Sequence, residues 1–196
     1  MSQLGLYKRN VRDALGHLNT HDPSSATAFV RRNLPRAPLY DSASDTGQVA
    51  LVTQVMTSVP IYLAAGEVVT NLTFRSGATA ADTPTNWWFA LYSAAATPAL
   101  LSQTADQLTT AWAANTTMTK ALAAAQTIPE DGIYWAAIMV KATAVPTLLG
   151  ACCAPAIAAL GEKNLSQSSG SGLTTTAPAT IATPTAKNFA PFVALT

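Results

Sequence analysis

Two segments of this chain are apolar on both faces of an extended strand. They are NWWFALYS at residues 86–93 and GIYWAAIMVK at residues 132–141. Successive side chains of a strand point to opposite faces. In the first segment, one face would therefore carry Trp87, Phe89 and Leu91, and the other Trp88, Ala90 and Tyr92. In the second, the faces would carry Ile133, Trp135, Ala137 and Met139, and Tyr134, Ala136, Ile138 and Val140.

Both strands must therefore be covered on two sides. We expect the opposite sheet of a β-sandwich to cover one face and another subunit to cover the second. The side chains expected at this subunit interface are Trp88, Tyr92, Tyr134 and Ile138. A carbohydrate-binding platform is the competing interpretation of the aromatic run. It would need carboxylates and amides beside the rings, and only Asn86 and Asp82 are near.

Further short segments rich in β-branched and apolar residues recur along the body, with no long helical pattern between them. One is preceded by Glu130-Asp131-Gly132, a strong turn signal. This succession predicts an all-β fold, an antiparallel jelly-roll-like β-sandwich over residues 48–196, rather than a βαβ fold. The additional strand segments are expected at residues 48–63, 67–77, 98–104, 116–125 and 189–196.

Residues 147–188 are dominated by small side chains and do not fit this pattern. Residues 154–160 could form a helical turn, and residues 166–184 are expected to be a long loop, because Ser, Thr, Gly, Ala and Pro offer little to bury. We expect a partner to order such a loop. Cys152 and Cys153 are the only cysteines. Neighbouring cysteines cannot pair without strain, so we interpret them as small buried hydrophobic residues.

Residues 1–47 are predicted to form a basic N-terminal arm with a linker. Residues 4–18 have the periodicity of an amphipathic helix, and residues 31–47 resemble an extended linker. Residues 1–36 hold six basic and two acidic side chains, a net +4, whereas residues 37–196 hold five basic and eight acidic, a net −3. We expect the arm to dock on a partner protein through Leu4, Tyr7, Lys8, Arg9, Val11, Arg12, Leu15, Leu18, Arg31, Arg32 and Arg36.

The residues that could support catalysis or metal binding are sparse. His17 and His21 are four residues apart, which would place them on one face of a helix, but no third metal-ligating residue follows at a spacing typical of a metal site. No nucleophile elbow or phosphate-binding loop is present. We therefore expect no enzyme activity, cofactor or metal. The basic arm lacks interleaved aromatic residues, so nucleic acid is not the expected partner. Carboxylates that a glycosidase could use are Glu67, Asp82, Asp106, Glu130, Asp131 and Glu162.

The surface chemistry points to an assembly component. Only 11% of the residues are charged, against about 25% in a typical soluble domain. No apolar run approaches the ~20 residues of a membrane span, and the N-terminus lacks the apolar stretch of a signal peptide. We therefore expect a protein made in the cytosol, with no membrane partner.

Three phrases resemble those of a known group of proteins. They are PTNWWFALY, ADQ followed by AWAANT, and VPTLLG. Over about residues 31–150, the chain resembles small jelly-roll structural proteins of tailed phages, chiefly those of actinobacteria. The resemblance implies a structural role in the virion, assembled in the host cytoplasm, and it brings no catalytic residues.

Three functions follow as hypotheses. The first is a capsid decoration or minor capsid protein, a homotrimer whose arm lies along the major capsid protein. The second is a minor tail or tail-tip protein with a carbohydrate-binding adhesion module. The third is a carbohydrate-active enzyme, which the shortage of titratable side chains in the body disfavours.

Overall fold

The computed structural model describes residues 48–152 and 163–196. The predicted arm, the helical turn at residues 154–160 and Cys153 lie outside these ranges. Within them there are strands and no helix, and none of these residues forms a helix long and apolar enough to cross a membrane. The strands are β1 (Gln48–Ala50), β2 (Met56–Leu63), β3 (Val68–Arg75), β4 (Asn86–Tyr92), β5 (Leu100–Gln103), β6 (Thr117–Thr127), β7 (Gly132–Lys141), β8 (Thr147–Cys152), β9 (Gln167–Ser169), β10 (Thr185–Ala186), β11 (Phe189–Pro191) and β12 (Val193–Leu195).

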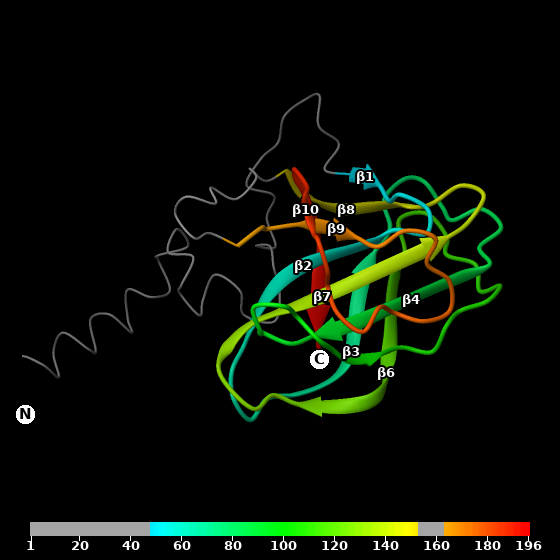
Figure 1. The fold of residues 1–196 in the computed structure, drawn as a ribbon. Helices are drawn as coiled ribbons and strands as arrows, with labels where there is room; N and C mark the ends of the chain where they lie inside the picture. The colour runs from blue at the N-terminus through cyan, green and yellow to red at the C-terminus, as the bar shows by residue number, and fades with distance from the viewer. Residues whose placement is uncertain (1–47, 153–162) are drawn as a thin grey trace, which may run out of the picture.

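The strands form three sheets, in which all neighbouring strands pair antiparallel (Figure 1). The largest has six strands in the order β10-β9-β2-β7-β4-β5, and the smaller two have the orders β1-β8-β11 and β12-β3-β6. Only Phe192 separates β11 from β12, so the end of the chain connects the two small sheets. The all-β prediction is confirmed.

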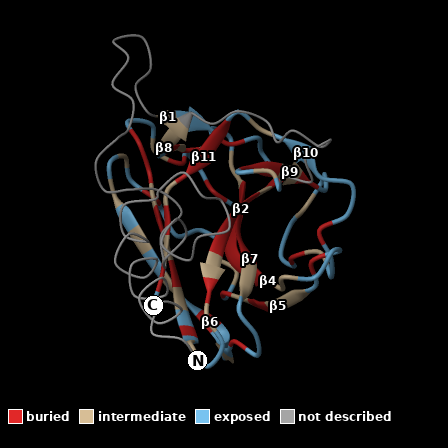
Figure 2. Cartoon of the chain, turned by 90° about the vertical axis from the view of Figure 1, so that its left-hand side faces the viewer, coloured by how far each residue is buried: buried red, intermediate tan, exposed pale blue. Residues whose placement is uncertain are grey.

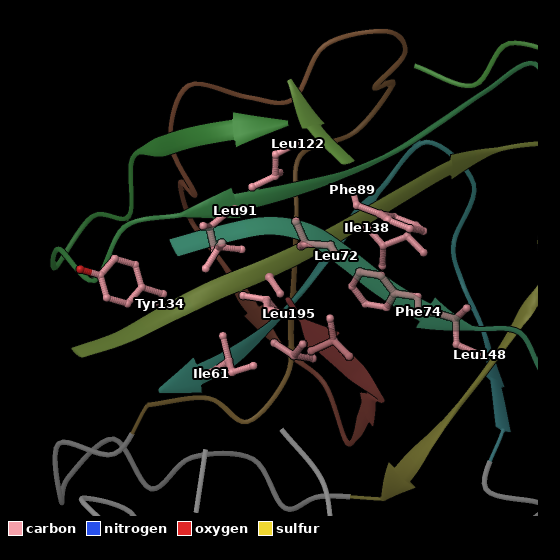
Figure 3. Close-up of a cluster of buried hydrophobic side chains, with 14 of the residues drawn as sticks. Ile61, Leu72, Phe74, Phe89, Leu91, Leu122, Tyr134, Ile138, Leu148 and Leu195 are labelled. Atoms are coloured by element: carbon pink, nitrogen blue, oxygen red, sulfur yellow. The ribbon is translucent and has the colours of Figure 1, made fainter. Parts of the chain in front are cut away.

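The two small sheets face the six-stranded sheet and enclose the main core. In Figure 3, Ile61, Phe89 and Ile138 of the large sheet meet Leu72 and Phe74 of β3, Leu148 of β8 and Leu195 of β12. Aromatic rings fill one part of this core, with centroids 4.7 Å apart for Phe74 and Phe89. In Figure 2 the buried residues concentrate in β2, β4 and β7. The arrangement is that of a β-sandwich.

The predicted alternation of β4 and β7 is confirmed. Trp87, Phe89 and Leu91 belong to the main core, whereas Trp88, Ala90 and Tyr92 belong to a second apolar cluster. In β7, Tyr134 and Ile138 lie in the main core, and Trp135, Ala137 and Met139 in the second cluster. All seven residues of β4 are buried. Both faces of the central strands are therefore covered, as the sequence required.

Several predicted segments differ from the observed strands. Residues 48–63 divide into β1 and β2, which join different sheets, because Gln54 turns the chain with a φ of 60° and its N–H donates to Val140 O at 3.0 Å. The final segment likewise divides at Phe192. The predicted loop at residues 166–184 begins with β9, and the small-residue stretch also contains β8 and β10. These strands were missed because their local composition carries little β signal.

The approach of β11 to β8 requires glycine at position 150. A Cβ atom there would collide with the carbonyl oxygen of Ala190 and lie 2.8 Å from Cζ of Phe189. We expect Gly150→Ala to lower the free energy of unfolding by about 1–3 kcal/mol, because the backbone or the Phe189 ring must move. Urea denaturation measures this loss. Gly66→Ala is the comparison: its Cβ would meet nothing within 4 Å, so only its φ of +83° opposes the change, at about 1 kcal/mol. Equal stability of Gly150→Ala and the wild type would contradict the close approach.

Candidate functional site

The predicted docking residues of the arm lie outside the described part of the chain. They are Leu4, Tyr7, Lys8, Arg9, Val11, Arg12, Leu15, Leu18, Arg31, Arg32 and Arg36. Their role stays a prediction from the sequence. The same holds for His17 and His21. Among the residues that the structure does describe, no three His, Cys, Asp or Glu side chains are placed to hold a metal ion.

The predicted interface residues are buried within the single chain. The exposed fractions of the side chains of Trp88, Tyr92 and Ile138 are 0%, and that of Tyr134 is 1%. Tyr134 and Ile138 face the sandwich core, whereas Trp88 and Tyr92 lie on the opposite face of the sheet. The assignment of these four residues to one subunit interface is therefore wrong. The strands do need two covers, but the chain itself supplies both.

The second cover is the segment of residues 173–181, the covering segment, which follows β9 and appears orange in Figure 1. Ala177 and Ile181 of this segment are buried against the second apolar cluster, and Leu173 packs beside them. Its backbone also satisfies the polar atoms of the aromatic side chains beneath it. Trp88 Nε1 donates to Thr174 O at 2.7 Å, and Tyr92 Oη donates to Pro178 O at 2.8 Å.

Two glutamines and the neighbouring strand edge fix the covering segment in place. Gln103 donates through Nε2 to Thr175 O at 2.9 Å and accepts the N–H of Ala177 through Oε1 at 2.6 Å. Gln54 Nε2 donates to Leu173 O at 3.3 Å. The backbone of Ile181 donates to Pro98 O at 2.9 Å, beside β5. Contacts within the chain therefore hold this part of the predicted loop, for which the sequence predicted a partner.

Burial beneath this segment changes the acidity of Tyr92. Burial raises its pKa well above the ordinary value of 10.0. The unfolded chain therefore loses a proton near pH 10 that the folded chain retains. The contribution of Tyr92 to stability is complete below pH 10 and is lost as the pH rises above it toward the folded-state pKa.

Above pH 10, we expect the unfolding free energy of Tyr92→Phe to fall less steeply with pH than that of the wild type. The slopes should differ by up to about 1.4 kcal/mol per pH unit, the value for one proton. Burial also raises the pKa values of Tyr62 and Tyr134, so some dependence should remain in the variant. Urea denaturation of both proteins between about pH 8 and 11 compares the slopes. Identical slopes would show that the Tyr92 hydroxyl is accessible and ionises in the folded state.

The polar residues beside the aromatic run support the fold. Asn86 Nδ2 donates to Asp106 Oδ2 at 2.6 Å, which ties β4 to the loop after β5. Lys120 Nζ lies 5.1 Å from the centroid of Trp87 and donates to Gln107 Oε1 at 2.9 Å. Because the rings of Trp87 and Trp88 are fully buried, they cannot present a stacking surface to a sugar. The carbohydrate platform interpretation of this aromatic run is therefore wrong.

Three of the candidate acidic residues gather where the β2–β3 and β6–β7 turns meet, each of which links the two layers of the sandwich. Asp131 Oδ1 accepts the N–H of Ala65 at 2.8 Å, and Ile128 N–H donates to the carbonyl oxygen of Glu67 at 2.8 Å. The Glu130 carbonyl accepts the hydroxyl of Tyr134 at 3.0 Å. Burial, followed by the neighbouring Asp131, raises the pKa of the Tyr62 hydroxyl. The Asp131 carboxylate therefore helps to hold the two turns together, whereas Glu67 and Glu130 take part in these contacts through their backbone carbonyls.

Sequence reasoning missed the covering segment. The available signal was the combination of indole and phenol groups on a buried face with a nearby run of small residues. Buried Trp and Tyr side chains need hydrogen-bond acceptors, and a chain of small residues can bring its backbone carbonyls close to them.

Comparison with known proteins adds no family. No protein-family model matches the chain, and no curated protein is significantly similar to it.

Proposed function

We propose that this protein is a non-enzymatic structural component of a tailed-phage virion, a capsid decoration or minor capsid protein on the outside of the particle. The observation that carries the proposal is the contrast between body and arm. The body closes both faces of its central sheet with its own residues. The segment that precedes it carries a net charge of +4 over residues 1–36.

A jelly-roll topology is part of this proposal. Successive strands change repeatedly between the two layers of the sandwich: β1 lies in the small sheets, β2 in the large sheet, β3 in the small sheets, and β4 and β5 in the large sheet. The remaining strands continue in this way to β11 and β12. Repeated exchange between two antiparallel layers is characteristic of Greek-key and jelly-roll connections.

The proposed partners are the major capsid protein, through the arm, and further copies of the chain in a trimer. A basic amphipathic arm suits an acidic protein surface, because burial of its apolar stripe and ionic contacts would act together. The trimer must use surfaces other than Trp88, Tyr92, Tyr134 and Ile138, which the fold buries. A location in the tail, as a minor tail or tail-tip protein, is the alternative within the same class.

Counting copies in purified particles tests the location. We expect quantitative mass spectrometry to give hundreds of copies per virion, because a shell protein repeats with the lattice of the major capsid protein. The counts of the major capsid protein and of a tail-tube protein in the same sample serve as internal references. A few to tens of copies would move the assignment to the tail, and absence from particles would overturn the virion proposal.

A further inference from the structure

Several buried polar side-chain atoms have no hydrogen-bond partner among the described residues, although native proteins satisfy nearly all such atoms. By contrast, the polar atoms of Trp88 and Tyr92, in the second apolar cluster of the six-stranded sheet, are satisfied by the covering segment. The unpartnered atoms are Ser58 Oγ, Asp106 Oδ1, Trp135 Nε1, Ser166 Oγ and Ser169 Oγ.

Three of these atoms belong to neighbouring positions on one face of the six-stranded sheet. Ser58 pairs with Gln167 of β9, and Met56, two residues earlier on the same face of β2, pairs with Ser169. Ser58 also pairs with Ala137 of β7, and Pro60, two residues later, pairs with Trp135. Ser58 is thus the diagonal neighbour of Ser169 on one side and of Trp135 on the other.

The three side chains are also shielded from bulk water. The exposed fractions are 0% for Ser58, 4% for Trp135 and 7% for Ser169. The positions between them on this face, Met56, Ala137 and Gln167, are neutral and buried. The surroundings of these atoms are therefore buried and uncharged, which suits a small neutral hydrogen-bonding group.

We propose that Ser58, Trp135 and Ser169 form a binding site for ordered water inside the protein, with Ser58 at its centre. The indole N–H can only donate, whereas each serine hydroxyl can donate and accept. One water molecule can accept from Trp135 and still exchange hydrogen bonds with Ser58, and a second can extend the chain to Ser169. Buried water molecules typically make about three hydrogen bonds to groups of this kind.

The site lies beside the start of the covering segment. β9 pairs with β2 through only three residue pairs, and the chain then turns at Gly170 and Gly172, with φ values of 71° and 64°, into the covering segment. Water that connects β9, β2 and β7 would hold the start of this segment on the sheet. The site therefore couples β9 to the cover over Trp88 and Tyr92.

Nuclear magnetic resonance of the ¹⁵N-labelled full chain tests the proposal, with a variant Trp135→Phe to assign the indole signal. We expect a rotating-frame Overhauser contact between water and the Trp135 indole proton, with the sign of a dipolar contact rather than of chemical exchange. The Trp88 indole is the internal control, since its N–H donates to Thr174 O, and it should show no such contact.

Two serine variants make the test specific. Ser58→Ala should weaken the water contact of Trp135 and shift its indole signal, whereas Ser168→Ala, paired with Thr57 on the opposite face, should leave both unchanged. Lack of a water contact at Trp135 in the wild type overturns the proposal, and so does a contact with protein protons in place of water. The wild-type measurement decides the matter even if Ser58→Ala does not fold.

Discussion

Replacing Trp88 with alanine should lower the free energy of unfolding by about 3–5 kcal/mol. The ring is fully buried in the second apolar cluster, between β4 and the covering segment. Its removal creates a cavity and also leaves the carbonyl oxygen of Thr174 without its donor. Because small domains have a total stability of about 5–15 kcal/mol, a large part of the variant should unfold near physiological temperature.

Two further variants accompany Trp88→Ala. One separates the loss of the indole hydrogen bond from the loss of apolar area, and the other is a control at an exposed position. Trp88→Phe keeps most of the apolar area and loses the indole N–H, so it should cost about 1–3 kcal/mol from the unsatisfied carbonyl and the smaller ring. Leu108→Ala, at a position that is 58% exposed, should have almost no effect. Thermal and urea denaturation measure all three. A Trp88→Ala body that keeps its stability and only changes its association state would restore the interface interpretation.

Deletion of residues 2–36 should abolish incorporation into virions and leave the body folded. The residues of the two apolar clusters that the structure describes lie between positions 51 and 195, and we expect them to form the core without the arm. The deleted residues carry the net +4 charge and the predicted apolar stripe. Without them, the proposed docking contacts to an acidic protein surface are absent.

Circular dichroism and particle composition together measure the two parts of this expectation. The truncated body should stay soluble with an unchanged β-type spectrum, and particles assembled in its presence should lack it. Substitution of Lys8, Arg9 and Arg12 by glutamine in the full chain is the matched control for charge. It should weaken incorporation most at low salt, and the difference from the wild type should shrink as salt screens the ionic contacts. Normal incorporation of the truncated protein would refute the docking role. Loss of the fold would show that the arm covers the body.

The sequence by itself determined the class of fold and the faces of the central strands. The assignment of Trp87, Phe89 and Leu91 to one face of β4, and of Trp88 and Tyr92 to the other, follows from the period of two in any extended strand. The demand for two covers follows from the same pattern. These inferences are local, because they depend only on neighbouring residues and on the cost of exposing aromatic surface to water.

Only the tertiary structure decided what covers the second face. Trp88 and Thr174 are 86 positions apart, and nothing in the local composition of residues 173–181 reveals which sheet face they will lie on. The sequence pattern predicted that a second subunit covers this face, because an apolar face does not specify what packs against it. The contacts with Trp88 and Tyr92 use the backbone carbonyls of Thr174 and Pro178, and because every residue type carries a carbonyl, these contacts leave no signal in the sequence. The burial of Tyr134 and Ile138 on the opposite face likewise became visible only once the strands were arranged in two layers.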